Sequence, residues 1–446
     1  MSDLELLASA EAAAFAAVLR ALLQEVHFDQ VNHDLRLPEF GGDYLIRPFP
    51  LPGSPVDVSN MKARLRHVVK SAGNESDRRF AKRIQLAFRF LMFGEAIDRQ
   101  ALADFFGAER RDWIDMGINV GLFVPDGPNQ LRMNGLSIFS RRLPGGDALY
   151  LLADTPPHFY ARSGPLRVYA GADSYELMLR ISAGDPTSGY VVEMGTGSGI
   201  QLITALKKHR AIVKAIGVER DHRALRVSLF NAALNQEADR FMVVPDAGQL
   251  REVLGGHDVA FGLSNPPFLA VPGSLEALDG QLVDVEAAFP QAGWGGSDGL
   301  QITRQFIDVF RSVGASKLLI YSQFAGDAHG PSLIRKFVER TGDFEFAFEP
   351  IKSGGGINKK PVHTAAESAL TVARLLTAVL LEKPKPERPR LVVREGGPEH
   401  RLMQNLAAQI EESYRRLRVT HFHDGFVQLT RFSDSYTNPS GCLINQ

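Results

Sequence analysis

Two short segments of the sequence carry residue types that could bind and align a ligand. In the first, Glu193 is followed by Gly195, Gly197 and Gly199, in the pattern Glu-x-Gly-x-Gly-x-Gly. Glycine allows positive φ and close approach of a ligand, and a following helix N-terminus offers unpaired N–H groups and partial positive charge. The pattern predicts a nucleotide-binding turn. Its spacing differs from the Gly-x-Gly-x-x-Gly of a dinucleotide fingerprint.

The second segment is Asn265-Pro266-Pro267-Phe268, which ends the strand-like run His257–Ser264. Two consecutive prolines cannot continue a strand ladder, and they restrict the backbone dihedral angles around them. They therefore hold Asn265 at the carboxyl end of a strand, where the ligand crevice of an open α/β sheet lies. We expect the side-chain amide of Asn265 to face a bound ligand.

Together these segments resemble the motifs of class I S-adenosylmethionine (SAM) methyltransferases, in the amino-methylating branch with an Asn/Asp-Pro-Pro-aromatic signature. The resemblance implies a Rossmann-like α/β sheet, SAM as the cofactor and a nitrogen as the methyl acceptor. The two segments lie roughly 70 residues apart, which fits the βα rhythm of about 30 residues in such sheets.

Strands that must lie between the two segments supply further polar side chains. The strand 213–218 ends at Glu219, where a carboxylate can accept hydrogen bonds from ribose hydroxyls. The strand 241–245 ends at Asp246, which we expect to accept the adenine amino group, with Ala247 beside the ring. Glu193 would orient the ligand's ammonium, directly or through water. The predicted cofactor-binding residues are Glu193, Gly195, Thr196, Gly197, Gly199, Glu219, Asp246, Ala247 and Asn265.

The acceptor side of the predicted reaction depends on alignment and on where charge is placed. An amide or arylamine nitrogen is a poor nucleophile because its lone pair is delocalised. Asn265 Oδ1 and the Pro266 carbonyl could accept its two N–H groups, and Phe268 could stack on a planar acceptor. We therefore predict Asn265, Pro266 and Phe268 as catalytic, and Pro267, Phe268 and Trp294 as substrate-binding.

The run 289–300 is similar to the Gly-Gly-x-Asp-Gly-Leu segment of the glutamine methyltransferases that modify peptide release factors. The resemblance implies that this segment packs behind the active site and shapes the acceptor pocket. A glycine-rich turn with Asp298 as a helix N-cap is a compatible alternative. Phe268 stands where those enzymes usually have tyrosine, and the N-terminal part of this chain is larger than theirs.

A broader resemblance, over roughly Arg78–Ala347, is to larger bacterial methyltransferases with an N-terminal winged-helix-like domain; the segments 90–95 and 231–235 carry it. The periodicity predicts helices over 4–26, 77–93, 97–106 and 109–120, then strands over 121–124 and 130–133. We expect a helical, winged-helix domain over 1–147, a methyltransferase domain over 148–382 and a C-terminal extension over 383–446.

A winged helix could bind DNA, and basic residues do gather upstream of it, between Lys62 and Arg83. The expected recognition helix, however, carries Asp112 and Asp115, which would repel phosphates. We therefore favour substrate recognition or dimerisation for this domain. A homodimer is left open.

Other segments gave weaker predictions. Tyr169, Ser174 and Tyr175 could close over the methionine end of SAM, although helix capping and core packing explain them as well. The run 352–360 is expected to be a flexible linker or a lid, and 366–382 a strand or a helix. His421 and His423 could suggest a metal, but a structural role is favoured, and no metal is predicted.

Composition sets few limits. The net charge of −1 gives no general reason to expect nucleic acid or an anionic membrane as a partner. The single cysteine, Cys442, excludes an intrachain disulfide and fits a reducing cytosol. Neither a signal peptide nor a membrane span is expected, so the predicted location is cytoplasmic.

The sequence thus predicts a SAM-dependent methyltransferase that acts on an amide or amino nitrogen of a protein, nucleic acid or small molecule. Two alternatives stay open. One is a biosynthetic enzyme that methylates a small molecule or otherwise consumes SAM. The other is a non-enzymatic DNA-binding regulator that responds to SAM.

Overall fold

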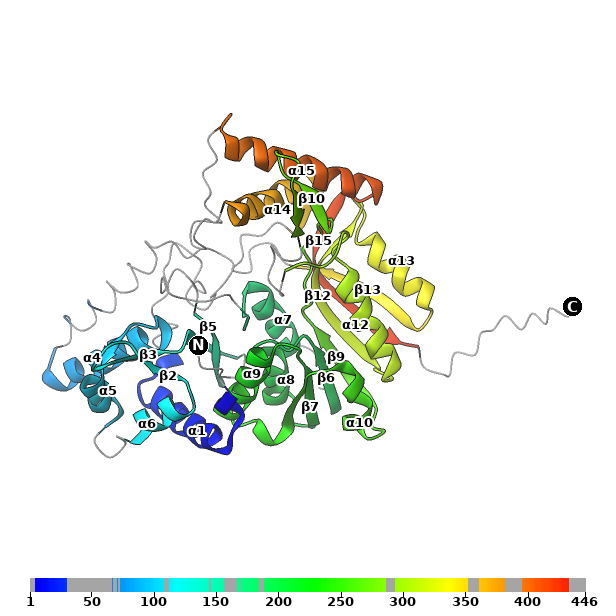
Figure 1. The fold of residues 1–446 in the computed structure, drawn as a ribbon. Helices are drawn as coiled ribbons and strands as arrows, with labels where there is room; N and C mark the ends of the chain where they lie inside the picture. The colour runs from blue at the N-terminus through cyan, green and yellow to red at the C-terminus, as the bar shows by residue number, and fades with distance from the viewer. Residues whose placement is uncertain are drawn as a thin grey trace, which may run out of the picture.

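The chain folds around a twisted sheet with helices on both faces, as Figure 1 shows for the computed structural model. The described residues are 5–29, 66, 70, 73–107, 112–143, 146–155, 167, 168, 170–183, 188–285, 293–351, 361–381 and 395–432. Among the described residues, no helix combines the length and apolar character that crossing a membrane requires.

The central sheet has the strand order β13-β15-β12-β9-β6-β7-β8, with β14 paired to β15. Its strands are β6 (Gly189–Met194), β7 (Ile212–Val218), β8 (Phe241–Val244), β9 (Val259–Ser264), β12 (Lys317–Gly326), β13 (Phe344–Pro350), β14 (Val362–Thr364) and β15 (His421–Arg431). The strands from β12 to β8 are parallel, whereas β15 runs antiparallel to β12 and β13. The predicted α/β class with a mainly parallel sheet is confirmed.

The chain order reverses between β6 and β9. From β6 the chain runs outward to β7 and β8, then returns to β9 on the other side of β6 and continues to β12. The loops after β6 and β9 therefore diverge at the carboxyl edge of the sheet, which is where open α/β sheets form their ligand crevice. Gly195 and Asn265 are the first residues after these two strands.

Residues 421–431 correct one prediction. We expected 383–446 to be an appended extension, but β15 lies inside the sheet between β12 and β13, with Phe426 opposite Tyr321. Both partner strands, β12 and β13, lie well upstream in the sequence. No local pattern therefore revealed that another strand pairs between them. The segment 366–382, left open between strand and helix, belongs mainly to α14 (Ala365–Leu380).

Helices cover both faces because successive strand residues point to opposite sides. Val191 of β6 packs in one core with α7 (Ala172–Ala183), α8 (Ile200–Lys208) and α9 (His222–Leu234). Val192, the next residue, packs in a second core with α10 (Leu250–Leu254), α12 (Gln301–Ser312) and α13 (Ser332–Thr341). Strands buried on both faces are typical of parallel sheets.

The N-terminal part lies beside α8 and α9, at the lower left of Figure 1. Its elements are η1 (Glu5–Ala8), α1 (Ala10–Glu25), α4 (Glu75–Ala87), the π-helical η4 (Phe88–Met92), β1 (Ile97–Asp98), α5 (Arg99–Phe106), α6 (Asp112–Asn119), β2 (Phe123–Pro125) and β3 (Gln130–Met133). The strands β1, β3 and β2 form a small sheet. The predicted order of helices and hairpin is present, and its assignment as a winged helix stays a prediction.

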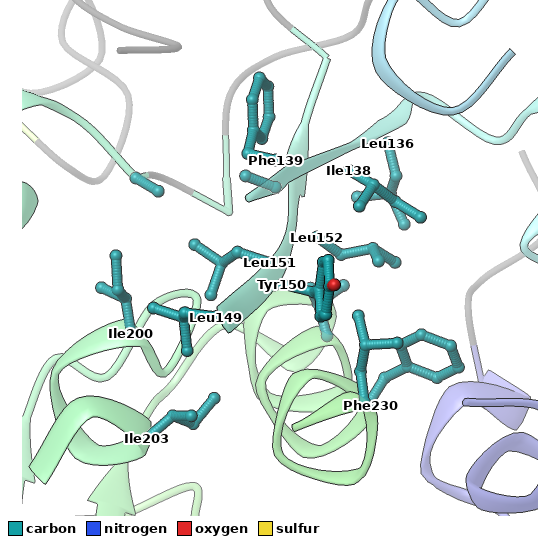
Figure 2. Close-up of a cluster of buried hydrophobic side chains, with 14 of the residues drawn as sticks. Leu136, Ile138, Phe139, Leu149, Tyr150, Leu151, Leu152, Ile200, Ile203 and Phe230 are labelled. Atoms are coloured by element: carbon teal, nitrogen blue, oxygen red, sulfur yellow. The ribbon is translucent and has the colours of Figure 1, made fainter. Parts of the chain in front are cut away.

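The hairpin of β4 (Leu136–Arg142) and β5 (Ala148–Asp154) joins this part to the central sheet. Figure 2 shows its apolar side chains above α8 and α9, with Tyr150 and Leu152 toward Phe230. The expected domain boundary at 147/148 falls in the turn of this hairpin, so both sides of the boundary belong to one packed unit.

A third core lies at the top of Figure 1. There α14 and α15 (Pro398–Arg416) pack with the hairpin of β10 (Ser274–Glu276) and β11 (Leu282–Asp284). Gln409 of α15 both accepts from Glu276 N, at 2.9 Å, and donates to Glu276 O, at 2.7 Å. The C-terminal helices thereby hold the segment that follows Asn265.

Candidate functional site

The glycine turn after β6 has the left-handed backbone that its sequence requires. The φ angles of Gly195, Gly197 and Gly199 are 73°, 54° and 79°. Gly199 is the N-cap of α8 and provides no side-chain cap, so the first N–H groups of the helix are free of a capping side chain. A Cβ on Gly199 would lie 3.2 Å from Phe241 and Ser228, which makes Gly199 a packing residue behind the turn.

Glu219 is held by backbone donors on both carboxylate oxygens. Gly197 N donates to Oε2 at 2.8 Å, and Asp221 N donates to Oε1 at 2.9 Å. Burial raises the pKa of Glu219 above its ordinary value, and these two hydrogen bonds oppose that shift. The carboxylate is therefore fixed beside the glycine turn. Asp221 also caps α9 as expected, because its Oδ1 accepts from Arg223 N and Ala224 N.

A cavity of about 450 Å³ opens at this edge of the sheet. Its lining includes these predicted residues: Gly195, Thr196, Gly197, Glu219, Asp246, Ala247, Asn265, Pro266, Pro267 and Phe268. Loops after β6, β7, β8 and β9 contribute to this set. The structure therefore brings the two sequence motifs together in one cavity.

Asn265 has one satisfied and one unsatisfied side-chain atom. Its Nδ2 lies 3.0 Å from Asp173 Oδ2 and 3.4 Å from Ser174 Oγ, both at the start of α7. Its Oδ1 is buried and has no hydrogen-bond partner among the described residues. A buried acceptor without a partner costs about 1–3 kcal/mol, a cost that a hydrogen-bond donor on a ligand would remove.

The glycine-rich segment packs directly behind the Asn265 loop. A Cβ on Gly295 would lie 2.8 Å from Pro267 O, and one on Gly299 would lie 2.5 Å from Phe268 O. Only glycine allows the two backbones to approach so closely. Asp298 accepts from Leu300 N at 3.0 Å, immediately before α12. The segment thus supports the loop, as the resemblance implied.

Three predicted residues do not line the cavity: Glu193, Gly199 and Trp294. Trp294 is half-buried against the third core, and its Nε1 donates to Val271 O at 2.9 Å. This placement supports a role in fixing the loop, and does not support direct substrate contact.

Glu193 is fully buried in β6, and neither carboxylate oxygen has a hydrogen-bond partner among the described residues. Burial, followed by the negative charge of Glu219, raises its pKa well above the ordinary value. Of the weaker candidates, Tyr169 lies outside the described residues, Ser174 lines the cavity, and Tyr175 is buried with Arg141 over its ring at 5.7 Å.

The sequence reasoning missed several cavity residues. Neither Asp173 nor Arg167 was among the predicted site residues, and both line the cavity. Ile302, Gln305 and Phe306 of α12 line the cavity at helical spacing. Helical spacing of such residues usually indicates packing. The only feature of the sequence that pointed to the cavity was therefore the position of α12 directly after the glycine-rich segment.

His421 and His423 lie on β15 outside this cavity. His423 Nε2 is 2.8 Å from Asp327 O. Within the described part of the chain, no group of three or more histidine, cysteine or acidic side chains could hold a metal ion.

Comparison with known proteins finds partial similarity to solved structures at low sequence identity. No protein-family model and no curated sequence matches the chain. Solved structures that resemble it include a SAM-dependent methyltransferase from Agrobacterium tumefaciens, with 13% identity, a TM-score of 0.31 and coverage of 52% of this chain and 71% of the other.

Two further structures are similar over shorter parts of the chain. A ribosomal protein L11 methylase from Lactobacillus delbrueckii subsp. bulgaricus has 14% identity and a TM-score of 0.27, covering 42% of this chain and 76% of its own. A precorrin-6y C5,15-methyltransferase from Geobacter metallireducens has 13% identity and a TM-score of 0.27, covering 42% and 77%. Identities and TM-scores this low do not decide what the present chain binds.

Proposed function

We propose that the chain is a SAM-dependent methyltransferase that transfers a methyl group to an amide or amino nitrogen. The observation that carries the proposal is the shared cavity. On one side lies the turn fixed to Glu219, and on the other lies Asn265 with an unpartnered, buried Oδ1. A nucleotide-like donor and an N–H-bearing acceptor would thus meet at one edge of the sheet.

The donor side fits the polar groups of SAM. Each Glu219 oxygen accepts one backbone N–H and keeps a lone pair for a ribose hydroxyl. Asp246 Oδ1 accepts from Gly248 N at 2.6 Å, which leaves Oδ2 for the adenine amino group. Buried Glu193, which has a raised pKa, would lose its proton as a cationic ligand binds nearby. When bound, SAM would supply an electrophilic methyl group on its sulfonium.

The acceptor side would align a weak nucleophile. Asn265 Oδ1 and the Pro266 carbonyl would accept the two N–H groups of the acceptor and direct the nitrogen lone pair toward the donor. Phe268, half-buried in the cavity lining, would pack on a planar acceptor. The rate would then come from alignment and fixed dipoles, as in other displacement reactions on enzymes. The acceptor could belong to a protein, a nucleic acid or a small molecule.

Calorimetric titration with S-adenosylhomocysteine, the product form of the cofactor, tests the donor side. The wild-type chain should bind it, and Glu219→Ala should weaken binding by about 1–3 kcal/mol through the loss of hydrogen bonds to a charged group. Glu252→Ala, an exposed carboxylate on α10, is the matched control and should bind normally. Equal affinity for Glu219→Ala and wild type would refute the assignment.

Methyl transfer from tritiated SAM into fractionated host extract tests the reaction itself. Label should enter a distinct acceptor fraction and should survive treatments that cleave methyl esters, because N-methyl bonds are stable to mild base. Label that is released by mild base would contradict a nitrogen acceptor.

A further inference from the structure

The orientation of the Asn265 amide depends on a residue far away in the sequence. Its Nδ2 donates to Asp173 Oδ2, and the two residues are 92 positions apart. We propose that Asp173 is a positioning residue that fixes this amide, so that Asn265 presents only its oxygen to the methyl acceptor. The inference rests on the proposed function, because it gives Asn265 Oδ1 a ligand.

The two ends of an asparagine amide have nearly the same shape, so packing alone cannot select between them. An ionised carboxylate can only accept hydrogen bonds. If the amide were flipped, Oδ1 of Asn265 would face the Asp173 carboxylate at about the same separation, and two acceptors would repel. The 3.0 Å contact with Nδ2 is therefore the favoured arrangement.

Ser174, which also contacts this amide, cannot determine its orientation. A hydroxyl group can donate or accept, and Ser174 Oγ lies farther from Nδ2, at 3.4 Å. The same oxygen also accepts from Gly171 N at 3.3 Å. The choice of orientation therefore depends on the Asp173 carboxylate.

Asp173 is itself held in place. It lies in the first turn of α7, where a negative charge is favourable, and it is only 7% exposed. Leu177 and Met178 of the same helix are fully buried in the core beside the sheet. The helix therefore places the carboxylate at the edge of the cavity, next to the end of β9.

With this orientation, the Asn265 side chain offers a ligand a hydrogen-bond acceptor and no hydrogen-bond donor. Its Oδ1 is buried and has no partner among the described residues. A flipped amide would present N–H groups instead, which would occupy the lone pair of a nucleophile rather than bind its hydrogens. Loss of the fixed orientation should therefore weaken any ligand that donates hydrogen bonds at this position.

Sinefungin measures this property without knowledge of the acceptor. In this SAM analogue an amine-bearing carbon replaces the methylated sulfonium, so it carries N–H donors where the methyl group would be. S-adenosylhomocysteine has no donor there. Calorimetric titration gives the affinity of each ligand. The ratio of the sinefungin affinity to the S-adenosylhomocysteine affinity therefore reports which atom Asn265 presents.

Two neutral variants separate orientation from charge. In Asp173→Asn, the new amide has two orientations, and in about half of the molecules its oxygen can still accept from Nδ2 of Asn265. The affinity ratio should therefore fall only about twofold beyond the effect of removing the negative charge. In Asp173→Leu, no acceptor remains, and the ratio should fall about tenfold. Asp239→Asn, exposed and outside the cavity lining, is the control and should leave the ratio unchanged.

The outcomes are distinct. The inference is supported if the affinity ratio falls clearly further in Asp173→Leu than in Asp173→Asn while binding of S-adenosylhomocysteine is unchanged. Equal losses in both variants would show that only the charge matters, and no loss in either would remove any role; both results overturn the inference. A parallel fall in both affinities would instead make Asp173 a cofactor ligand, which also overturns it.

Folding and the proposed function are checked in the same experiment. If Asp173→Leu does not fold, Asp173→Ala replaces it with the same expected loss, because alanine also lacks an acceptor. If the wild-type chain binds neither ligand, the proposed function itself fails and the inference with it. Normal binding of S-adenosylhomocysteine together with an unchanged ratio in the variants would end the inference alone.

Discussion

The two sides of the cavity are built in different ways. On the donor side, the residues run from Glu193 to Ala247, and the central hydrogen bond, from Gly197 N to Glu219, spans 22 positions. On the acceptor side, Asn265 depends on Asp173, 92 positions upstream, and Ala270 O accepts from Tyr414, 144 positions downstream. The donor side is assembled from the consecutive strands β6, β7 and β8 and the loops that follow them, whereas the acceptor side depends on residues from Asp173 to Tyr414.

The difference suggests that the two sides can be disturbed separately. Changes on the acceptor side should alter turnover while the cofactor still binds. Changes that reach the glycine turn should alter cofactor affinity. The junction between the β4–β5 hairpin and α9 reaches the donor side, because Asn231 of α9 donates to Ser198 O in the glycine turn.

The largest effect is expected for Asn265→Ala. Turnover should fall about 1,000-fold, since a dipole aimed at the reacting group is lost. Affinity for S-adenosylhomocysteine should stay within about twofold, because the proposal assigns the unsatisfied Oδ1 to the acceptor and not to the cofactor. The measurements are tritium transfer from SAM and calorimetric titration, with exposed Asn119→Ala on α6 as a control. Normal turnover would remove Asn265 from the reaction.

Asn231 and Asn235 provide a matched pair at the junction. Each side chain makes three hydrogen bonds: Asn231 with Leu152 N, Leu152 O and Ser198 O, and Asn235 with Tyr150 N, Tyr150 O and Asn231 O. Both are fully buried. Replacing either with alanine should lower the free energy of unfolding by about 3 kcal/mol, measured by urea denaturation.

Only the Asn231 change should reach the cofactor side, because only Asn231 contacts Ser198 in the glycine turn. Affinity for S-adenosylhomocysteine should fall about fivefold in Asn231→Ala, the equivalent of one hydrogen bond, and should be unchanged in Asn235→Ala. Equal affinities in the two variants would show that the hairpin does not influence the turn.

Most of the donor-side positions that line the cavity were visible in the sequence because they follow recognisable strands, whereas Glu193 lies within β6 and Gly199 packs behind the turn. Glu219 follows a buried apolar run, and the glycine spacing at 195–199 requires a left-handed turn that the φ angles confirm. The motif around Asn265 was equally visible, since two prolines mark the end of β9. These features depend on local backbone geometry, which residue type reports directly.

The partners of Asn265 could not be predicted because tertiary packing creates them. Nothing in the run around Asp173 distinguishes a carboxylate that orients an amide from one that caps a helix. Trp294 was predicted to bind substrate, but in the structure its Nε1 donates to Val271 O. The place of β15 in the sheet was missed for the same reason.

Tyr414→Phe tests the longest connection on the acceptor side. Tyr414 is fully buried, and its hydroxyl donates to Ala270 O at 2.6 Å. Loss of this hydrogen bond should cost about 1 kcal/mol of stability and lower turnover severalfold, because the segment after Phe268 would be held less firmly. Cofactor affinity should not change. A variant with normal turnover and lower stability would limit α15 to a structural role.

The smallest effect, on the donor side, is a change in the pH dependence of stability for Glu193→Gln. Burial raises the pKa of Glu193 well above its ordinary value of about 4.5, so the native state holds a proton that the unfolded state releases. Wild-type stability should therefore decline as pH rises from that ordinary value toward the raised native pKa, and glutamine removes this decline. The melting temperature of the variant minus that of wild type should increase between pH 5 and pH 8, whereas exposed Glu252→Gln should show a constant difference. The test is how the difference in melting temperature changes with pH, because an unpaired glutamine amide lowers stability equally at every pH. A difference that does not change with pH would mean that the Glu193 carboxyl is ionised in the native protein. The cofactor side would then need a cation already in place.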